Sequence, residues 1–396
     1  MPRLSTAVRD QRRHHMNQLM DRLEVDALVF GSADFFQYAS NFLLDVWPWE
    51  RPVFLFVPRQ GQPFALMNEL SQHHVAMCQA KQTLWLEDIC WYAEHPRRNH
   101  PLPLPDQIPG VLVELLKHHG LAASRLAIDL PHPLLATVQA RLPGLALRPA
   151  HHEMRSLRWV KHAEELAIMR ALGQLTDWLQ DRYREHYRPG VLVQVVDQQM
   201  GALMAEEAAH RFPGEDFEIM KCWTLTGPAS ASPHGDGASC GARIQPGDTL
   251  VNFVLPRLNG YYVENERTWF CGQPDARQRH AFETARLATE AAVASAVPGR
   301  RVCDMDAAAL AVIEAAGLDA HVLHRTGHAV GLMLHEYPED MAFNTRELQA
   351  GEVYSAEPGI YIQGLGGFRL DDTVVVGQPP EVLVKTPKSL DYATVG

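Results

Sequence analysis

Hydrophobic and polar residues alternate in a way that predicts a helix followed by a strand at the start of the chain. Apolar residues recur at helical spacing from Arg12 to Leu23, and the β-branched run from Val25 to Ser32 ends in Gly-Ser as a buried strand does. Similar runs follow, with strands predicted at Pro52 to Val57 and Leu126 to Ile128 and a glycine-terminated helix at Val111 to Gly120. The segment from His95 to Gly110 contains five prolines and is predicted to be a surface loop. We therefore expect a mixed α/β layer here.

The pattern changes near residue 155, where a long helical run begins and continues to about His186. We place a domain boundary there, which gives a first domain at residues 1–154 and a second at residues 155–396. In the second domain, helices are predicted at Val193 to Phe212, Asp275 to Ala296 and Asp304 to Ala315, and strands at Thr249 to Leu255, Tyr261 to Phe270, Val353 to Ile362 and Thr373 to Val376.

Length and composition support two globular domains and exclude several classes of partner. The chain has 396 residues, of which 46% are hydrophobic and 21% charged, as in ordinary globular proteins. Its net charge of -11 disfavours nucleic acid and anionic membrane as partners. There is no apolar run of the ~20 residues that a membrane span needs, and no secretory signal pattern, so we expect a cytoplasmic protein. The six cysteines form no CxxC pair and are interpreted as reduced thiols.

Ionisable residues gather beside glycine and proline in four segments of the second domain. These segments are SPHGDG (Ser232 to Gly237), GYYVENERTW (Gly260 to Trp269), HRTGHAVGLMLHEYP (His324 to Pro338) and SAEPGIYIQGLGGFRLDD (Ser355 to Asp372). His324, His328 and His335 are spaced by four and then seven residues, which places them on one helix face or along one wall of a loop. The simpler interpretation of such a triplet is three exposed histidines on a solvated surface.

Taken in order, these motifs resemble a known superfamily. DALVFGSADFFQYASNF, LRWVKHAEELAIMRAL, GYYVENERTW, GHAVG, SAEPGIY and FRLDDTVVV together look like those of aminopeptidase P, prolidase and creatinase. The resemblance covers nearly the whole chain. It implies an α/β (α+β) protein with an N-terminal mixed α/β domain of the creatinase/prolidase type and a C-terminal pita-bread catalytic domain. It also implies a homodimer, and a loop around Trp47 and Trp49 that relatives project toward a partner's pocket.

The resemblance implies a metal site that has lost one ligand. Metal-dependent members bind two divalent ions through two aspartates eleven residues apart, one histidine and two glutamates. Their equivalents here are Glu264, His328, Glu357 and Asp371, but the first aspartate position falls on Phe253, next to Asn252, and offers no carboxylate. Because hard divalent ions need several oxygen ligands, a dinuclear site is not expected. We expect either one ion (Mn, Fe or Zn) or a metal-free polar cluster.

Creatinase, which uses this fold without metal, offers a second precedent. Its pocket glutamate matches Glu266 and its pocket histidine matches His234, whereas His324 and His335 match the outer histidines of aminopeptidase P. If Glu264, Glu266, Glu357 and Asp371 converge, each like-charged pair costs about 4 kcal/mol at ~4 Å and an effective dielectric of ~20. A cation is therefore required: a metal ion, Arg267, Arg369, shared protons or a cationic group of the substrate.

We predict a hydrolase that cleaves a C–N bond of a small cationic or amide-containing molecule. With metal, Glu357 or Glu264 would help to deprotonate water, and His324 or His234 would stabilise the oxyanion. Without metal, His234 would be acid and base, and Glu266 and Glu357 would hold the substrate's positive group. His335, Arg369 and Tyr262 are the predicted substrate contacts, although structural pairing is the simpler role for Arg369 and core packing for Tyr262. The alternatives are an Xaa-Pro peptidase, a metal-dependent lyase and a non-catalytic binding module.

Overall fold

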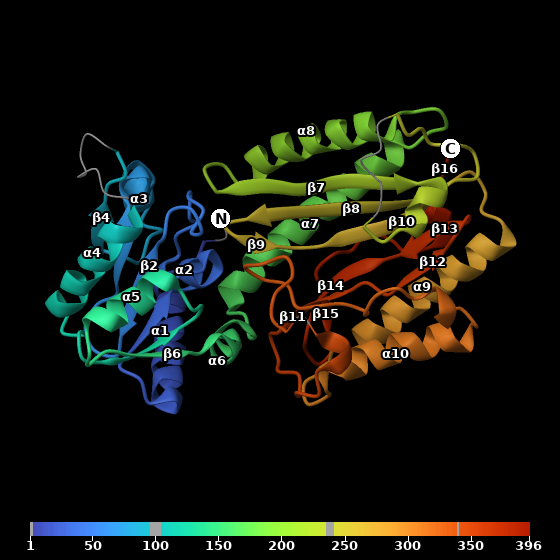
Figure 1. Ribbon diagram of the computed structural model, residues 1–396. Coiled ribbons are helices and arrows are strands. Elements are labelled where there is room, and N and C mark those ends of the chain that lie inside the picture. Colours follow the sequence, from blue (N-terminus) through green and yellow to red (C-terminus); the bar gives the residue numbers. More distant parts are fainter. Residues whose placement is uncertain (1–2, 96–103, 235–240, 339) are drawn as a thin grey trace. The chain divides into compact units, whose positions relative to one another are not determined.

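The structure is a computed structural model that describes residues 3–95, 104–234, 241–338 and 340–396 (Figure 1). The chain divides into two compact units, Arg3–Arg158 and Trp159–Gly396. The predicted boundary at residues 154 and 155 lies between the short helices α6 (His151–Met154) and η2 (Arg155–Arg158), just before this division.

The first unit is built on a six-stranded mixed sheet with the order β4-β3-β2-β1-β5-β6. Its strands are β1 (Ala27–Phe30), β2 (Phe54–Pro58), β3 (Phe64–Asn68), β4 (Asp88–Tyr92), β5 (Arg125–Ile128) and β6 (Ala146–Pro149). Its helices are α1 (Thr6–Leu23), α2 (Ala33–Ser40), α3 (Gln72–Ala80), α4 (Leu104–His118) and α5 (Pro133–Arg141), with the single turn η1 (Glu69–Ser71). All residues of β1, β2 and β3 are buried, which explains why their sequences are continuous apolar runs.

The predicted proline-rich loop is wrong in its second part, because α4 already begins at Leu104; residues 96–103 lie outside the described residues. Ile108, Leu112 and Leu116 are spaced by four residues and are at most 1% exposed, so one face of α4 packs fully into the core. Pro105 is in the first turn, where a missing N–H costs nothing, but Pro109 lies inside the helix. Burial of the apolar face outweighs the single hydrogen bond that Pro109 removes.

The second unit contains a larger sheet with the central order β11-β14-β10-β8-β7. These strands are β7 (Phe217–Thr226), β8 (Thr249–Leu258), β10 (Asn265–Cys271), β11 (Val353–Ala356) and β14 (Asp371–Val375), joined at the margins by β9 (Tyr261–Tyr262), β15 (Glu381–Val382) and β16 (Thr394–Val395). A separate hairpin pairs β12 (Gly359–Ile362) with β13 (Gly366–Arg369). The helices are α7 (Ala163–His186), α8 (Val193–Arg211), α9 (Ala276–Ala294), α10 (Val302–Ala315) and α11 (Leu390–Ala393), with the short turns η3 (Gly227–Ala231), η4 (Asp319–His321) and η5 (Met341–Phe343).

Two predicted strands are interrupted. The predicted strand from Val353 to Ile362 is two strands in different sheets, because Pro358 follows Glu357, has no N–H and cannot continue the ladder. The predicted strand from Tyr261 to Phe270 is likewise divided into β9 and β10. Both interruptions lie beside glutamates that the sequence singles out, Glu357 and Glu264.

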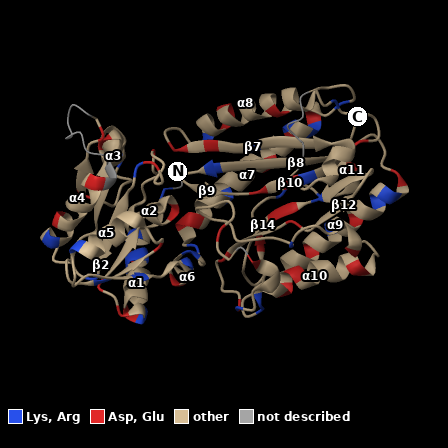
Figure 2. Ribbon diagram, viewed as in Figure 1, with Lys and Arg blue, Asp and Glu red and all other residues tan. Residues whose placement is uncertain are grey.

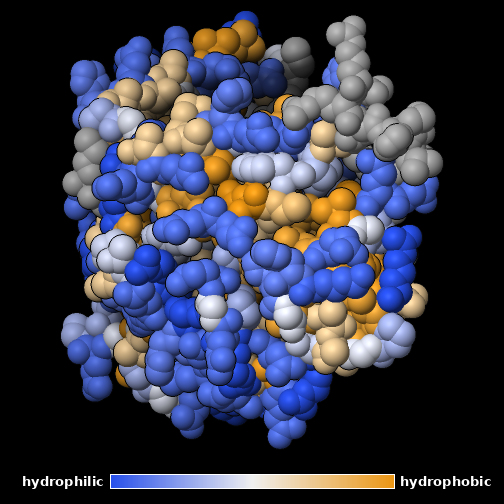
Figure 3. All heavy atoms as spheres, turned by 90° about the vertical axis from the view of Figure 1, so that its left-hand side faces the viewer, coloured by the Kyte–Doolittle hydropathy of each residue, from blue (hydrophilic) through white to orange (hydrophobic). Residues whose placement is uncertain are grey.

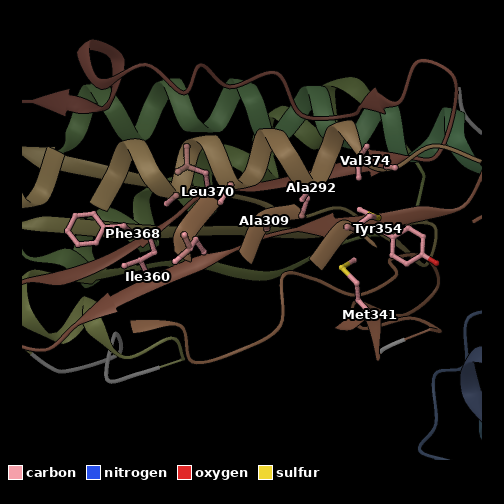
Figure 4. Close-up of a cluster of buried hydrophobic side chains, with 14 of the residues drawn as sticks. Ala292, Ala309, Met341, Tyr354, Ile360, Phe368, Leu370 and Val374 are labelled. Carbon is pink, nitrogen blue, oxygen red and sulfur yellow. The ribbon is translucent and has the colours of Figure 1, made fainter. Parts of the chain in front are cut away.

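Helices cover one face of the larger sheet. Helices α7 and α8 contact β7, β8 and β10, and α9 contacts β13 and β14 (Figure 1). The core beneath α9 and α10 consists of small helical alanines, such as Ala292 and Ala309, packed on Phe368, Leu370 and Val374 (Figure 4). Alanines let the helices approach the sheet closely, which fixes the strands in place. The opposite face of β8, β10 and β14 therefore has a rigid support.

In the part of the chain that the structure describes, no helix is long and apolar enough to cross a membrane. The view in Figure 3 shows a face on which hydrophilic residues predominate and hydrophobic residues form bands between them. Exposed apolar side chains include Trp47 and Trp49, at 69% and 81% exposure. The predicted role of these two tryptophans at a partner subunit stays a prediction.

A buried carboxylate joins α7, α8 and β7. Asp197 accepts hydrogen bonds from the Thr224 backbone N–H (3.0 Å), the Thr224 hydroxyl (2.7 Å) and the Tyr183 hydroxyl (3.0 Å). The Thr224 hydroxyl also contacts Tyr187 and the side-chain amide of Asn252. Burial raises the pKa of Asp197 to about 6, although these hydrogen bonds oppose the shift.

This shift predicts a pH dependence of stability that Asp197→Asn removes. Because the folded protein holds the Asp197 proton up to a pKa of about 6 rather than 3.8, wild-type stability falls as pH rises through this interval. The full effect is about 3 kcal/mol, of which about 1.4 kcal/mol falls between pH 5 and pH 7.5. Urea unfolding at both pH values should show the wild type losing this amount relative to Asp197→Asn. Parallel pH curves for the two proteins would contradict a raised pKa.

Candidate functional site

Four side chains from four neighbouring strands form one row on the face of the larger sheet opposite to the helices. The register pairs Trp223 of β7 with Phe253 of β8, Phe253 with Glu266 of β10, and Glu266 with Asp371 of β14. Directly opposed residues of antiparallel strands point to the same face. The row therefore begins with two aromatic rings and ends with two carboxylates, and it defines the floor of the site.

Glu357 and His328 are brought to this row by loops that are hydrogen-bonded to each other. The Ser355 backbone N–H donates to the His328 carbonyl (2.8 Å), and the Glu357 N–H donates to the Thr326 carbonyl (2.7 Å). A Cβ atom on Gly327 would lie 2.0 Å from the Ser355 carbonyl oxygen, so only glycine permits this approach. The sequence Thr-Gly-His thus positions an imidazole against β11.

The predicted metal ligands converge. His328 Nε2 lies 3.6 Å from Glu264 Oε1 and 3.4 Å from Glu357 Oε1. One carboxylate oxygen from each of four acids lies within 4.8 Å of the others, the acids being Glu264, Glu266, Glu357 and Asp371. The predicted convergence of the acidic segments is therefore present in the structure. Figure 2 marks the acidic residues, including those along β14.

Besides Glu266 Oε2, which is ion-paired with Arg369, three buried atoms of this cluster that could bind a cation have no hydrogen-bond partner within the described residues. They are Glu264 Oε1, Asp371 Oδ2 and His328 Nε2. His328 Nδ1 is 3.0 Å from the Ala329 carbonyl, which can only accept, so Nδ1 carries a proton and Nε2 faces the carboxylates. Buried acceptors without a donor are costly and rare, which makes this group of atoms a candidate cation site.

The carboxylates of the cluster titrate unequally. Burial, and then the adjacent Asp371, raise the pKa of Glu264 well above its usual value. Burial, and then the charge of Glu357, raise the pKa of Asp371 to about 6. Burial alone would raise the pKa of Glu357, but contact with His328 and the charge of Arg369 outweigh it and hold this pKa below its usual value. Bringing these acids together therefore costs energy that a bound cation would recover.

Arg369 is a fixed cation inside the site. Its side chain is 1% exposed, its Nε lies 2.5 Å from Glu266 Oε2, and its Nη1 lies 3.7 Å from Glu357 Oε2. Nη1 also donates to the Tyr361 hydroxyl (3.1 Å), and the guanidinium lies 4.6 Å from the centre of the Phe253 ring. Burial raises the pKa of Glu266 and the charge of Arg369 lowers it. The neighbouring acids add to the rise, so this pKa lies well above its usual value. The expectation that Arg369 pairs structurally with these acids agrees with its contacts.

The predicted pocket histidines differ in their surroundings. The His335 ring stacks on His328, with centroids 3.8 Å apart. Loss of hydration on the stacked ring, and then the charge of His328, lower the pKa of His335 to about 4, although the residue remains exposed overall. Burial, and then the charge of Arg369, lower the pKa of His234. At neutral pH both rings are therefore uncharged.

His324 is more constrained than the sequence indicates. Its Nδ1 lies 2.7 Å from the Arg325 carbonyl, and its Nε2 lies 2.8 Å from the Tyr361 hydroxyl. Since the carbonyl can only accept, Nδ1 is the protonated nitrogen and Tyr361 donates to Nε2. A neutral His324 in this arrangement has no free N–H for an oxyanion, so its predicted stabilising role requires that the Tyr361 contact be broken.

Other predicted residues lie in different surroundings. Asn252 is fully buried and donates toward Trp223 and Thr224, on the strand face opposite to that of Phe253. Arg267 pairs with Asp372 (2.9 Å) on that same opposite face. The Tyr262 ring contacts the Arg257 guanidinium, 6.0 Å from the ring centre, so its predicted substrate contact stays a prediction.

The residues of the cluster fit a single divalent ion. Three carboxylates and one imidazole are hard or borderline donors of the kind that Mn²⁺, Fe²⁺ and Zn²⁺ accept, and three of their atoms make no hydrogen bond to any described residue. The position opposite Glu266, where a further carboxylate would complete a second site, is occupied by the Phe253 ring. The donor set therefore fits one ion better than two.

Fold and site together define a two-domain hydrolase of the pita-bread type. Residues 12–160 match the Creatinase/Prolidase N-terminal domain and residues 167–378 match metallopeptidase family M24. The chain belongs to metallopeptidase family M24, which confirms the predicted fold and the prediction of a hydrolase acting on C–N bonds.

Individual relatives agree with this assignment. The chain is 32% identical to the Xaa-Pro dipeptidase of Lactobacillus helveticus, over 86% of this chain and 87% of that protein. The crystal structure of dipeptidase PepE from Mycobacterium ulcerans superposes with a TM-score of 0.80 at 26% identity, over 99% of both chains. The N-terminal domain of the FACT complex subunit SPT16 from chickpea (Cicer arietinum) has a TM-score of 0.74 at 14% identity, covering 99% of this chain and 100% of that one, and shows a likeness of fold alone.

The buried Glu266–Arg369 pair predicts a large stability effect for Glu266→Gln. Removing the carboxylate of Glu266 leaves the buried charge of Arg369 with Glu357, 3.7 Å away, as its ion-pair partner, and weakening a buried pair in this way costs about 3 to 5 kcal/mol. Glu218→Gln is the matched control, because Glu218 pairs with Arg257 at the same distance of 2.5 Å but is 56% exposed; it should cost less than about 1 kcal/mol. Chemical denaturation in the presence of a chelator measures both. Equal, small losses would show that Glu266 is not ionised in the folded protein.

Proposed function

We propose that this protein hydrolyses the C–N bond of a small amide, a dipeptide or a molecule of similar size, with one divalent ion held by Glu264, His328, Glu357 and Asp371. The observation that supports this most directly is the group of unpartnered acceptors, Glu264 Oε1, Asp371 Oδ2 and His328 Nε2, which face one another in a buried cluster. The dipeptidase names of the relatives support an amide substrate.

The residues around the cluster supply the remaining parts of a hydrolytic site. When bound, a divalent ion would act as a Lewis acid and lower the pKa of water. The lowered pKa of Glu357 keeps this carboxylate ionised, as a ligand must be, and also makes it a weaker base toward water. His234 is a neutral imidazole near Glu357 and Arg369, whose charges act on it, so its ring can donate to a developing oxyanion. His324 is oriented by Tyr361 and is better suited to positioning than to donation.

Arg369 and Phe253 explain why one ion suffices in this proposal. Glu266 is engaged by Arg369 and is not available as a ligand without breaking a buried ion pair. The guanidinium contributes a permanent positive charge next to Glu357. The site thus has one exchangeable cation and one that belongs to the chain.

A second candidate, metal-free cleavage of a guanidino C–N bond as in creatinase, is favoured by the position of Glu266 within the cluster. In that scheme His234 is acid and base, and Glu266 and Glu357 bind a cationic group of the substrate. The pairing of Glu266 with Arg369 counts against it, because a cationic substrate would first have to displace the guanidinium.

Metal binding tests the first proposal directly. Chelated protein titrated with Mn²⁺, Fe²⁺ or Zn²⁺ should bind one equivalent and melt at a higher temperature, because an ion that binds only the folded state stabilises it. His328→Ala should abolish the temperature shift and lower hydrolysis of an Xaa-Pro dipeptide by more than about 100-fold. His210→Ala, at the exposed end of α8, is the control and should behave as wild type. Binding of less than a tenth of an equivalent would contradict the proposal.

Chelation and His234→Ala separate the two candidate reactions. We expect His234→Ala to lower turnover by about 100-fold while leaving metal binding intact, because it removes an oxyanion donor and no ligand. Chelation should abolish turnover of the wild type. If turnover of a guanidino compound survives chelation and is lost in His234→Ala, the metal-free reaction replaces the first proposal. If neither class of compound raises the melting temperature, the binding-module interpretation gains.

A further inference from the structure

An irregularity in β7 determines which of its side chains reach the site. The register runs from Ile219 paired with Pro256 to Lys221 paired with Leu255, so Met220 has no partner and forms a β-bulge. Met220 is 48% exposed. A bulge shifts the alternation of side chains by one residue. Without it, Met220 rather than Lys221 would oppose Leu255.

The shift places Lys221 and Trp223 on the same face as Phe253 and Glu266. Trp223 is directly opposite Phe253, with ring centroids 5.2 Å apart. Lys221 Nζ lies 4.9 Å from the centre of the Trp223 ring and 5.9 Å from that of Phe253. The bulge therefore places the Lys221 ammonium group next to Trp223 and Phe253, the two aromatic residues of the row.

Lys221 differs from Arg369 in having no carboxylate partner. Within the described residues, no acidic oxygen lies within 4.0 Å of its ammonium, and its side chain is half-buried. Arg369 contacts the same Phe253 ring but is already engaged by Glu266, Glu357 and Tyr361. An anionic group that enters the site therefore meets Arg369, which is already paired with carboxylates, and Lys221, which has no such partner among the described residues.

The surroundings of Lys221 define the kind of group that it could bind. Trp223 and Leu334 are partly buried and pack on a small apolar cluster of Leu225, Val251, Phe253 and Leu255. A single ammonium beside an apolar wall suits a singly charged carboxylate attached to an apolar group, rather than a multiply charged phosphate, which favours several donors or an arginine fork.

We propose that Lys221 determines specificity by binding a carboxylate of the substrate, with the apolar part of the same residue against Trp223, Phe253 and Leu334. This inference rests on the proposed amide hydrolysis and names a substrate class for it: amides in which an apolar residue carries a free carboxylate, such as dipeptides. Lys221 is at the end of the row remote from Asp371, so it would fix the far end of such a molecule while the scissile bond lies over the acids.

The experiment compares Leu-Pro with its C-terminal amide, Leu-prolinamide, on the metal-loaded protein. Lys221→Gln should raise KM for Leu-Pro by about 10- to 30-fold, with kcat and the kinetics of Leu-prolinamide little changed, because only the acid loses an ionic contact. Lys221→Arg should restore most of the preference for the acid. Lys385→Gln, an exposed lysine elsewhere in the unit, is the matched control and should leave both substrates unaffected.

A binding measurement keeps this inference separate from the proposed reaction. Calorimetry with proline and prolinamide should show that the wild type binds the acid more tightly and that Lys221→Gln loses this difference. If the wild type hydrolyses Leu-Pro but Lys221→Gln leaves the ratio of acid to amide affinities unchanged, the inference on Lys221 is wrong and the proposed reaction still stands. If neither substrate is hydrolysed, the proposed reaction fails, and the calorimetric ratio still decides the role of Lys221. Tighter Mn²⁺ binding by Lys221→Gln with an unchanged ratio would show that Lys221 only offsets the charge of the acids, and would overturn the inference.

Discussion

The constraint on which this site depends is the burial of several like charges on one rigid face. Glu264, Glu266, Glu357 and Asp371 lie within a few ångströms of one another, and repulsion between any two of them amounts to about 4 kcal/mol at ~4 Å. Folding of the remaining chain must hold them there. Close packing of alanine-rich helices behind the sheet provides the stiffness, and Arg369 with shared protons or a bound ion provides the neutralisation.

The paired positions Phe253 on β8 and Glu266 on β10 show how this constraint affects the choice of residues. Phe253 stands where the resemblance places an aspartate, and the residue directly opposite it on β10 is Glu266. The carboxylate is thus one strand away from its expected place, and Arg369 contacts both residues. The site therefore has a carboxylate at this level of the sheet, on the strand next to the expected one. A comparison of sequence positions alone would record a loss, whereas the paired strands show a rearrangement.

Much of the fold and the acidic cluster could be predicted, because both depend on local patterns and on motifs in a fixed order. Predictions failed where a distant contact decides the outcome. The apolar face of α4 extends a helix into a proline-rich segment, and Pro358 divides one predicted strand into two. The contact of His324 with Tyr361 depends on where β12 lies. Lys221 and Trp223 were missed because no strand was predicted at β7, where the bulge at Met220 interrupts the alternation of side chains.

The tight approach at Gly327 has a consequence for attempts to diversify this protein. Any side chain there would collide with the Ser355 carbonyl and displace the adjacent His328, so libraries that randomise the Thr326 to His328 loop would consist mostly of inactive members. Lys221 and Leu334 are partly buried side chains near the aromatic end of the row, and the part of the chain that the structure describes shows no such clash at either position. New selectivities should therefore be obtained by varying these two positions while the glycine loop is left untouched.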